Sequence, residues 1–507
     1  MTKRQTGVLF AVCAALLLVV VDVTVLHVAA PQIGDSLAAS ATELLWIVDI
    51  YPLVIAPLLL VSGVAADRFG RKRLLMSGLV VFAVGSIPAA LATTPLMLIL
   101  ARAVLAVGAA MIMPATMALV RVAFPDRAER LRAVGIWSAV SAVGAAMGPL
   151  IGGFLVEYFW WGAVFLINVP LGLLVLLLVW WMVAESRSQA DLVLDGLSVV
   201  LSVVAVLALV FAIKSLGRHG LGPVAGGYLL LAIVGCAWFI TRQLRRSRRG
   251  IEPLLNVRLF LRGSFTIAVL AVLLTMFAIV GLDLLFAQYL QNVLGQSPVE
   301  AALRLAPMAL ATVVGALSAH RIVHRFGSRI AISCGLGVAA IALTPLLTLG
   351  TAEMLLVFVG SLVALGFVLD VALVAANDII ISAVPQDYVG QAAGVEEVAY
   401  DLGGGLGIAV LGSIQAAIYT AAFVPASHLT SDQLSVARES ILGAEKLAQR
   451  SGPPTAGQIL DNAHRAFLEG FHTAIAVSVA VLALTALAGA IFITKDQLED
   501  RSDSDMH

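Results

Sequence analysis

Long apolar runs, separated by short polar segments, fill most of the 507-residue chain. The hydrocarbon core of a membrane is about 30 Å thick, so a helix needs about 20 apolar residues to cross it. The runs are about that long, and the pattern therefore predicts an all-α polytopic membrane protein. We expect fourteen transmembrane helices, at residues 8–30, 44–65, 74–93, 96–120, 133–156, 161–183, 195–215, 224–242, 264–289, 299–319, 330–350, 354–383, 391–420 and 470–494.

Composition agrees with this prediction, because 61% of the residues are hydrophobic and 12% are charged, against about 25% charged in soluble domains. Most of the 31 Lys and Arg residues fall on the side of the N-terminus, and the short loops on the other side hold only Lys214 and Arg218. Lys and Arg concentrate in cytoplasmic loops, so both termini are expected in the cytoplasm. The basic run at 245–250 lies just inside the membrane, which favours contact with anionic lipid over binding to nucleic acid.

A charged motif recurs in the two halves of the chain. Residues 63–72 read GVAADRFGRK and residues 320–329 read HRIVHRFGSR, so both contain Arg-Phe-Gly-x-Arg. Asp22 lies 48 residues before the glycine of the first motif, and Asp283 lies 44 residues before that of the second. The similar intervals indicate two six-helix copies, and parallel halves that face each other across a central cavity are an established transporter plan.

The repeat divides the chain into four parts, two of which are six-helix bundles. The expected parts are an N-terminal bundle at 1–185, two inserted helices with a basic cytoplasmic linker at 186–262, a C-terminal bundle at 263–494 and a cytoplasmic tail at 495–507.

The longest segment between predicted spans, 421–469, is expected on the outer face. Thr430 begins a capping box, and apolar residues follow at helical spacing until the Gly-Pro-Pro sequence at 452–454. A second short helix is predicted from Thr455. We expect a helical hairpin folded over the outer mouth of the cavity, with a disordered linker as the alternative.

Ionisable residues inside the predicted spans are mostly acidic. Each costs about 2.5–3.5 kcal/mol at the centre of a membrane helix, so such residues are functional candidates. A cavity with excess carboxylate attracts cations, and burial beside like charges favours the protonated form of each acid. One carboxyl group can then hold a proton or a cationic substrate in turn, as an antiporter requires. The acids are Asp22, Asp49, Asp283, Asp370, Glu396, Glu397 and Asp401, and the bases are Arg102 and Arg304.

Asp22 is the strongest single candidate, because it lies in the middle of the first span and no Lys lies in mid-span to neutralise it. Arg102, in the fourth span, is its expected partner. Asp283 stands at the equivalent place in the second half and is the natural second carboxylate. Phe286, one helical turn later, offers an aromatic face to a cation.

Two further groups of residues extend the candidate site. Trp46 and Asp49 are three residues apart and share a helix face, which suggests a cation-attracting vestibule, although Trp46 fits a membrane-interface anchor equally well. Glu397 and Asp401 are four apart on the thirteenth span and share a face, while Glu396 points about 100° away. Two carboxylates that close are not both ionised unless a cation lies beside them.

The fifth span carries a glycine face, with Gly144, Gly148 and Gly152 at intervals of four residues and Pro149 as a bend. Small residues at this spacing let helices pack closely. We expect a thin, kinked helix at the interface between the two halves.

The sequence gives little support to transport driven by ATP or to a protein class other than a transporter. No G-x-x-x-x-G-K-[ST] sequence occurs, which argues against direct use of ATP. No Cys/His spacing typical of a metal site occurs either, so we expect no cofactor and a cycle driven by the proton gradient. A membrane enzyme or receptor stays conceivable, but the chain shows no catalytic constellation and we expect no enzyme.

Several of these stretches resemble signatures of the major facilitator superfamily, and in particular of its fourteen-helix drug:proton antiporters. They are the loop at 63–72, Arg102 with Gly108, the antiporter motif GAAMGPLIGG at 144–153, VDVTVLHVAAP at 21–31 and FLINVPLG at 165–172. The acids Glu396, Glu397 and Asp401 are similar to those of exporters of quaternary ammonium compounds and methyl viologen.

The resemblance implies a protein of the bacterial inner membrane, functional as a monomer, that exports lipophilic cations: quaternary ammonium biocides, methyl viologen, cationic dyes and bisbiguanides. It implies that Asp22 exchanges protons and substrate with Arg102 as coupling partner, and that Asp67 and Arg68 act in gating. Gly148 and Pro149 belong to its exporter motif. The alternative is an importer, proton-coupled or facilitative, of an organic cation or another metabolite.

Overall fold

The computed structural model describes residues 1–188, 195–219, 222–249, 251, 253–351, 354–424 and 431–493, and within these ranges it is helical with no strand. The first group of helices is α1 (Lys3–Ser36), α2 (Ala41–Phe69), α3 (Arg71–Ala90), α4 (Pro95–Ala123), α5 (Arg127–Tyr158), α6 (Ala163–Leu166) and α7 (Asn168–Met182). The inserted pair is α8 (Gly196–His219) and α9 (Pro223–Arg248). The remaining helices are α10 (Gly263–Gln288), α11 (Pro298–Leu343), α12 (Leu355–Ser382), α13 (Val389–Ala422), α14 (Ser431–Glu439), α15 (Ile441–Gln449) and α16 (Pro453–Phe492).

Thirteen helices in the described part of the chain are long and apolar enough to cross a membrane. One of them, α11, has 46 residues and is about 70 Å long at 1.5 Å per residue, roughly twice the thickness of the hydrocarbon core. Gly327 interrupts it with non-helical backbone angles, φ 82° and ψ 157°. The two parts of α11 correspond to the predicted spans at 299–319 and 330–350, so the expected fourteen crossings are accounted for.

The repeated Arg-Phe-Gly-x-Arg motif has the same backbone feature in both halves. Gly70, between α2 and α3, has φ 110°, and Gly327 has φ 82°. Residues that have a Cβ rarely adopt such positive φ angles, because the Cβ clashes with the backbone, whereas glycine adopts them freely. The motif is therefore a tight turn between two membrane helices, and its glycine is what permits the turn.

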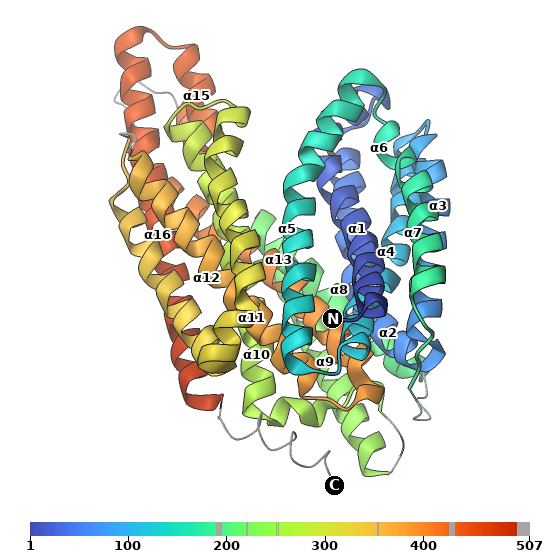
Figure 1. Cartoon of the computed structure of the whole chain (residues 1–507). Helices are drawn as coiled ribbons and strands as arrows, with labels where there is room; N and C mark the ends of the chain where they lie inside the picture. Colours follow the sequence, from blue (N-terminus) through green and yellow to red (C-terminus); the bar gives the residue numbers. More distant parts are fainter. Residues whose placement is uncertain are drawn as a thin grey trace.

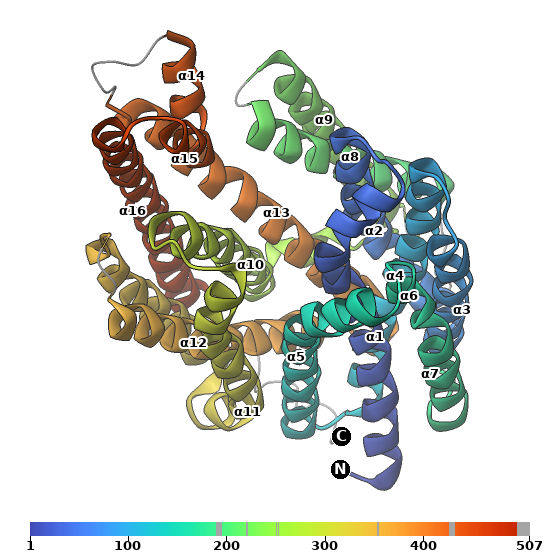
Figure 2. The ribbon, with the colours of Figure 1, turned by 90° about the horizontal axis from the view of Figure 1, so that it is seen from above.

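Two groups of helices stand side by side, with α1–α7 in one group and α10–α13 with α16 in the other (Figure 1). We call them the N-terminal group and the C-terminal group. The inserted helices α8 and α9 pack on each other at the periphery (Figure 2), where α8 contacts both α2 and α13.

The two groups meet at one end of the molecule, at the bottom of Figure 1. We call it the basic end, because it carries the arginines of the turn at 68–73, the start of α5 and the end of α9. There α2 crosses α13 so closely that a Cβ on Gly63 would lie 2.0 Å from the carbonyl oxygen of Gly390. In the same way, a Cβ on Gly135 of α5 would lie 2.3 Å from the carbonyl oxygen of Ala316 of α11.

Exposure along α5 shows that the groups separate away from the basic end. Most residues from Arg130 to Ala139 are buried. Farther along, residues 145–147, 149 and 150 are exposed, and the glycine face of the helix stays covered. The helix is thus enclosed by both groups near the basic end and by its own group alone beyond it, as the divergence of the ribbons in Figure 1 also shows.

The hairpin predicted at 421–469 is helical but differs from expectation in two respects. Its first helix is broken at Ser440, which caps α15 by accepting a hydrogen bond from the backbone N–H of Gly443 (3.1 Å). Its second helix is the beginning of the long α16. In the described residues the hairpin packs on α13 and α16 of its own group, where the Tyr419 hydroxyl donates to the carbonyl of Ala437 (2.9 Å), whereas we expected it over the outer mouth of the cavity. Thr430 of the expected capping box and the tail at 495–507 lie outside the described residues.

Candidate functional site

Asp22 lies in the interior of the N-terminal group, with 2% of its surface exposed. The Asn168 amide of α7 donates a hydrogen bond of 2.6 Å to its Oδ1. Its Oδ2 is buried and has no hydrogen-bond partner among the described residues. A buried carboxyl group with an unmatched oxygen is costly to keep ionised, so this group is suited to gaining and losing a proton.

Arg102 of α4 is buried near Asp22 without pairing with it. Its guanidinium lies over the rings of Tyr51 (4.9 Å) and Phe165 (5.9 Å). Its Nε and Nη1 have no acceptor within the described part of the chain, and Asp22 is close enough to interact with it electrostatically. The expected partner is therefore present, held by aromatic faces and free to respond to the charge of Asp22.

The acids of α13 form a second cluster. Glu396 and Glu397 are buried and Asp401 is half-buried, and none of the three makes an ion pair with a described residue. One carboxylate oxygen of each glutamate also lacks any hydrogen-bond partner there. Tyr51 of α2 lies within electrostatic reach of both Asp22 and Asp401, so Asp401 faces the same region as the acid of α1.

Asp370 of α12 joins these acids and also bridges the two groups. It is buried, and it accepts a hydrogen bond of 3.0 Å from the hydroxyl of Ser138 on α5. Tyr400 lies within electrostatic reach of Asp370 and of all three α13 acids. Sequence reasoning counted Asp370 among the acids but gave it no place in the site. Only the folded structure shows that Asp370 belongs near the site, because its serine partner lies 232 residues away in the chain.

Asp283 of α10 is exposed and makes no hydrogen bond or ion pair with the described residues. Phe286 on the same helix is fully buried. Its ring packs on Phe358 and Phe471, with centroid distances of 5.6 Å and 6.2 Å. It therefore lies in an aromatic cluster of the C-terminal group, and its face is covered in this conformation.

The expected vestibule on α2 has a cationic neighbour. Trp46 is exposed. Asp49 forms an ion pair of 2.6 Å with Lys214, which belongs to the inserted helix α8. Both residues lie toward the end of α2 away from the basic end, and the lysine fastens the inserted pair to the N-terminal group.

At the basic end, Asp67 is fully buried and its partner is Arg71 (2.7 Å). Its other oxygen accepts the backbone N–H of Gln391 on α13 (3.1 Å). Arg68, which the resemblance joined to Asp67, is exposed, and its guanidinium lies over the ring of Phe69. The backbone explains this arrangement, because Arg71 is four residues after Asp67 and the turn at Gly70 brings it back to the same face.

A second ionic contact closes the basic end. Asp378 of α12 is fully buried and pairs with Arg127 (3.0 Å) and Arg130 (3.1 Å) of α5. Sequence reasoning used these arginines only for topology. Asp378 lay near the end of a predicted span, where a charge is unremarkable, so no sequence signal marked it.

Replacing Asp378 with alanine is expected to lower the apparent melting temperature of the purified protein. The change leaves two arginines without their buried carboxylate, and breaking a buried pair in this way typically costs about 3–5 kcal/mol. Thermal unfolding in detergent measures the effect. Asp461→Ala, at an exposed position of α16, is the control, and an equal melting temperature for the two variants would contradict the role of the contact.

The glycine face of α5 packs inside the N-terminal group. A Cβ on Gly148 would lie 1.8 Å from the Thr24 hydroxyl of α1, and Gly144 and Gly152 also face α1. We expected a thin, kinked helix at the interface between the halves. Helix α5 lies at that interface, but it meets the other half at Gly135, which is next to Ala316 and nine residues before Gly144. Pro149 is exposed beside the glycine face.

Comparisons with known proteins give the family. The model of the Major Facilitator Superfamily matches residues 12–408. The multidrug efflux pump LfrA of Mycolicibacterium smegmatis is 38% identical and covers 97% of each chain. The methyl viologen resistance protein SmvA of Salmonella typhimurium is 37% identical, covering 97% of this chain and 99% of its own. The multidrug resistance protein Stp of Mycobacterium tuberculosis is 32% identical, covering 98% and 93%.

Solved structures share the fold at low sequence identity. The human organic anion transporter MFSD10 superposes with a TM-score of 0.62 at 13% identity, covering 95% of this chain and all of its own. The proton:xylose symporter XylE gives 0.62 at 15% identity, covering 96% and 95%. Together with the repeated turn and the two helix groups, these matches lead to one conclusion: the chain is a multi-pass membrane protein that belongs to the major facilitator superfamily.

Proposed function

We propose that the protein is a proton-coupled antiporter that exports lipophilic cations from the cytoplasm. The observation that carries the proposal is the excess of unpaired acids: Asp22, Asp283, Glu396, Glu397 and Asp401 make no ion pair with any described residue. Acids without permanent partners are free to bind protons and cations in turn. The proposed substrates are quaternary ammonium compounds, methyl viologen, cationic dyes and bisbiguanides.

The names of the relatives support this assignment. LfrA and Stp are described as multidrug pump and multidrug resistance protein, and SmvA as a methyl viologen resistance protein. Methyl viologen is an aromatic organic dication, and a pair of carboxylates on one helix face would attract its two charges. We also propose that the protein acts as a monomer in the bacterial inner membrane.

Charge distribution supports an orientation for the cycle. Lys and Arg concentrate on the cytoplasmic side of membrane proteins, so we place the basic end in the cytoplasm, together with both termini. In that orientation the described conformation is closed toward the cytoplasm by the Asp67 and Asp378 contacts. We further propose that it is open toward the outside, because the groups diverge there and residues 145–147 of α5 are exposed.

The proposed cycle is alternating access. With the basic end open, a cation binds at the acids and displaces protons. With the outer end open, protonation of the same acids expels the cation, and Arg102 responds to the changed charge of Asp22. Exchange of one proton for one monovalent cation moves no net charge, so it uses only the pH gradient, whereas a second proton would also use the membrane potential.

Everted membrane vesicles test the proposal. An imposed proton gradient, acidic inside, is expected to drive uptake of ethidium and methyl viologen into vesicles that contain the protein. Uptake that collapses when a protonophore is added supports antiport. Transport in the opposite direction would favour the alternative, an importer of an organic cation or another metabolite.

Glu397→Gln is expected to reduce transport of dications more than that of monocations. Glu397 and Asp401 share a face of α13 and offer two charges to one substrate, and glutamine leaves only one. Initial uptake rates of methyl viologen and ethidium measure the difference. Glu157→Gln, at an exposed position of α5, is the matched control, and an equal loss for both substrates in the Glu397 variant would refute the pairing.

A further inference from the structure

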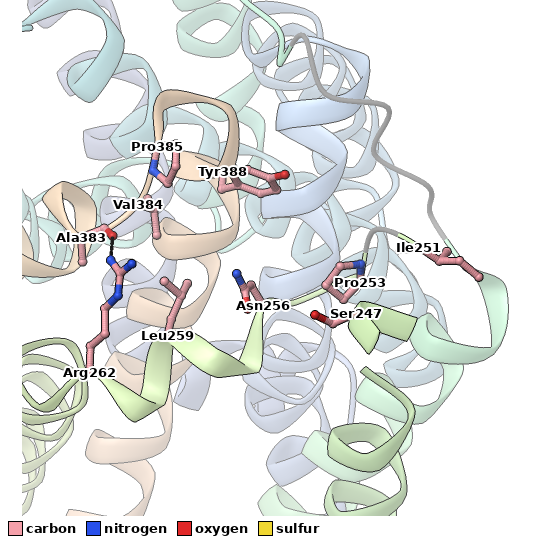
Figure 3. A pocket seen from close by; sticks show the side chains of 10 residues that line it. All are labelled: Ser247, Ile251, Pro253, Asn256, Leu259, Arg262, Ala383, Val384, Pro385 and Tyr388. Atoms are coloured by element: carbon pink, nitrogen blue, oxygen red, sulfur yellow. Dashed lines mark hydrogen bonds between the residues drawn. The ribbon is translucent and has the colours of Figure 1, made fainter. Parts of the chain in front are cut away.

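A cavity of 340 Å³ lies at the basic end, apart from the acids of the candidate site (Figure 3). One wall is the segment that joins α9 to α10, and the other is the loop that joins α12 to α13. Ligand sites in proteins typically measure about 300–1,000 Å³, so the cavity has room for a small polar group such as a phosphodiester.

Each polar side chain that lines the cavity can donate a hydrogen bond. Arg262 donates from Nη1 to the carbonyl of Ala383 (3.0 Å), and the rest of its planar, five-donor guanidinium makes no ion pair with a described residue. The side-chain oxygen of Asn256 accepts the backbone N–H of Arg258 (3.3 Å), so its NH₂ group stays available. Among the described residues that line the cavity none is acidic. A set of donors around an arginine matches the oxygens of a phosphate.

Two exposed apolar residues stand in the chain between the lining residues Leu259 and Arg262. The short helix η1 (Val257–Leu261) ends in Phe260 and Leu261, and 83% of the Leu261 surface is exposed. Exposed apolar side chains beside Arg258 and Arg262 are typical of a segment that lies at the surface of a bilayer. The arginines at the end of α9 add positive potential at the same level, which attracts anionic lipids.

We propose that this cavity binds the headgroup of an anionic phospholipid. Its phosphate contacts Arg262, with Asn256 and the Ser247 hydroxyl as further donors, and its acyl chains lie along Phe260 and Leu261. A lipid in this place joins the linker between the two groups to the loop that precedes α13. The choice of a lipid over a free anion rests on the exposed apolar side chains of Phe260 and Leu261 beside Arg262.

Binding of short-chain lipids to the full-length protein in non-ionic detergent tests the proposal, and the assay requires no transport. Dioctanoyl phosphatidylglycerol is expected to bind at least about tenfold more tightly than dioctanoyl phosphatidylcholine, because the choline headgroup keeps the phosphate but adds a positive charge that Arg262 and Arg258 repel. Inorganic phosphate is the third probe. Equal affinity for the two lipids, or phosphate binding as tight as that of phosphatidylglycerol, would overturn the assignment to an anionic lipid.

Two variants separate a specific site from general attraction to positive charge. Arg262→Ala is expected to weaken phosphatidylglycerol binding by about tenfold, and Arg248→Ala, which removes the same charge from an exposed position outside the cavity, by much less. Asn256→Asp places a negative charge in the cavity while keeping the contact between Arg262 and Ala383, and it should weaken binding as well. Equal losses for the two arginine variants, or unchanged binding in Asn256→Asp, would refute the site.

Discussion

Replacing Asp22 with asparagine is expected to abolish cation efflux while leaving the protein folded. Asparagine has nearly the same shape and can still accept the hydrogen bond that Asn168 donates, but it cannot take up or release a proton. Without that exchange the proton gradient cannot drive the transport cycle. Drug resistance of cells and uptake driven by a pH gradient in everted vesicles should both fall to the level of a strain without the transporter.

Two further variants make the Asp22 result interpretable. Asp35→Asn makes the same chemical change at an exposed position of α1 and is expected to leave transport unchanged. Asp22→Glu keeps an exchangeable carboxyl group and should restore part of the activity. The coupling role fails if the Asp22→Asn protein still concentrates substrate in response to a pH gradient. It also fails if Asp22→Glu is as inactive as asparagine despite normal expression and melting temperature.

The interior position of Asp22 could be predicted from the sequence because a carboxylate in the middle of an apolar run is costly and therefore conspicuous. The same argument located Glu396, Glu397 and Asp401. The spans themselves followed from run length, and the turn at Gly327 followed from its similarity to Gly70, although helix α11 continues on both sides of it. These features depend on the local chain alone.

Features that depend on a distant partner could not be found in this way. Asp378 contacts arginines that lie 248 and 251 residues away, and a charge near the end of a span has no special cost. Phe286 is one turn from Asp283, yet aromatic rings on α12 and α16 cover it. The glycine face of α5 was visible as a pattern, but the helix it packs on was not. The spacing of residues along a helix shows which of them share a face, but it does not show which other helix packs on that face.

Gly390→Ala is expected to prevent closure of the basic end and so to stop transport. A Cβ at this position would lie 2.1 Å from the carbonyl oxygen of Gly63 and 2.8 Å from the carboxyl carbon of Asp67. A carbon and an oxygen normally approach to about 3.3 Å, so α2 and α13 would have to part by about 1 Å. That shift also loosens the hydrogen bond between Asp67 and the backbone of Gln391, and both effects favour the open basic end.

Spin labels at Arg73 and Arg325, which are exposed at the basic end on opposite groups, measure the change in a background without native cysteines. Their distance is expected to lengthen in the Gly390→Ala protein. Gly412→Ala makes the same substitution on the same helix, where a Cβ meets no atom within 4 Å, and should leave distance and transport unchanged. Because the backbone contact is what limits the approach of α2 and α13, full transport with an unchanged distance in Gly390→Ala would show that closure does not depend on it.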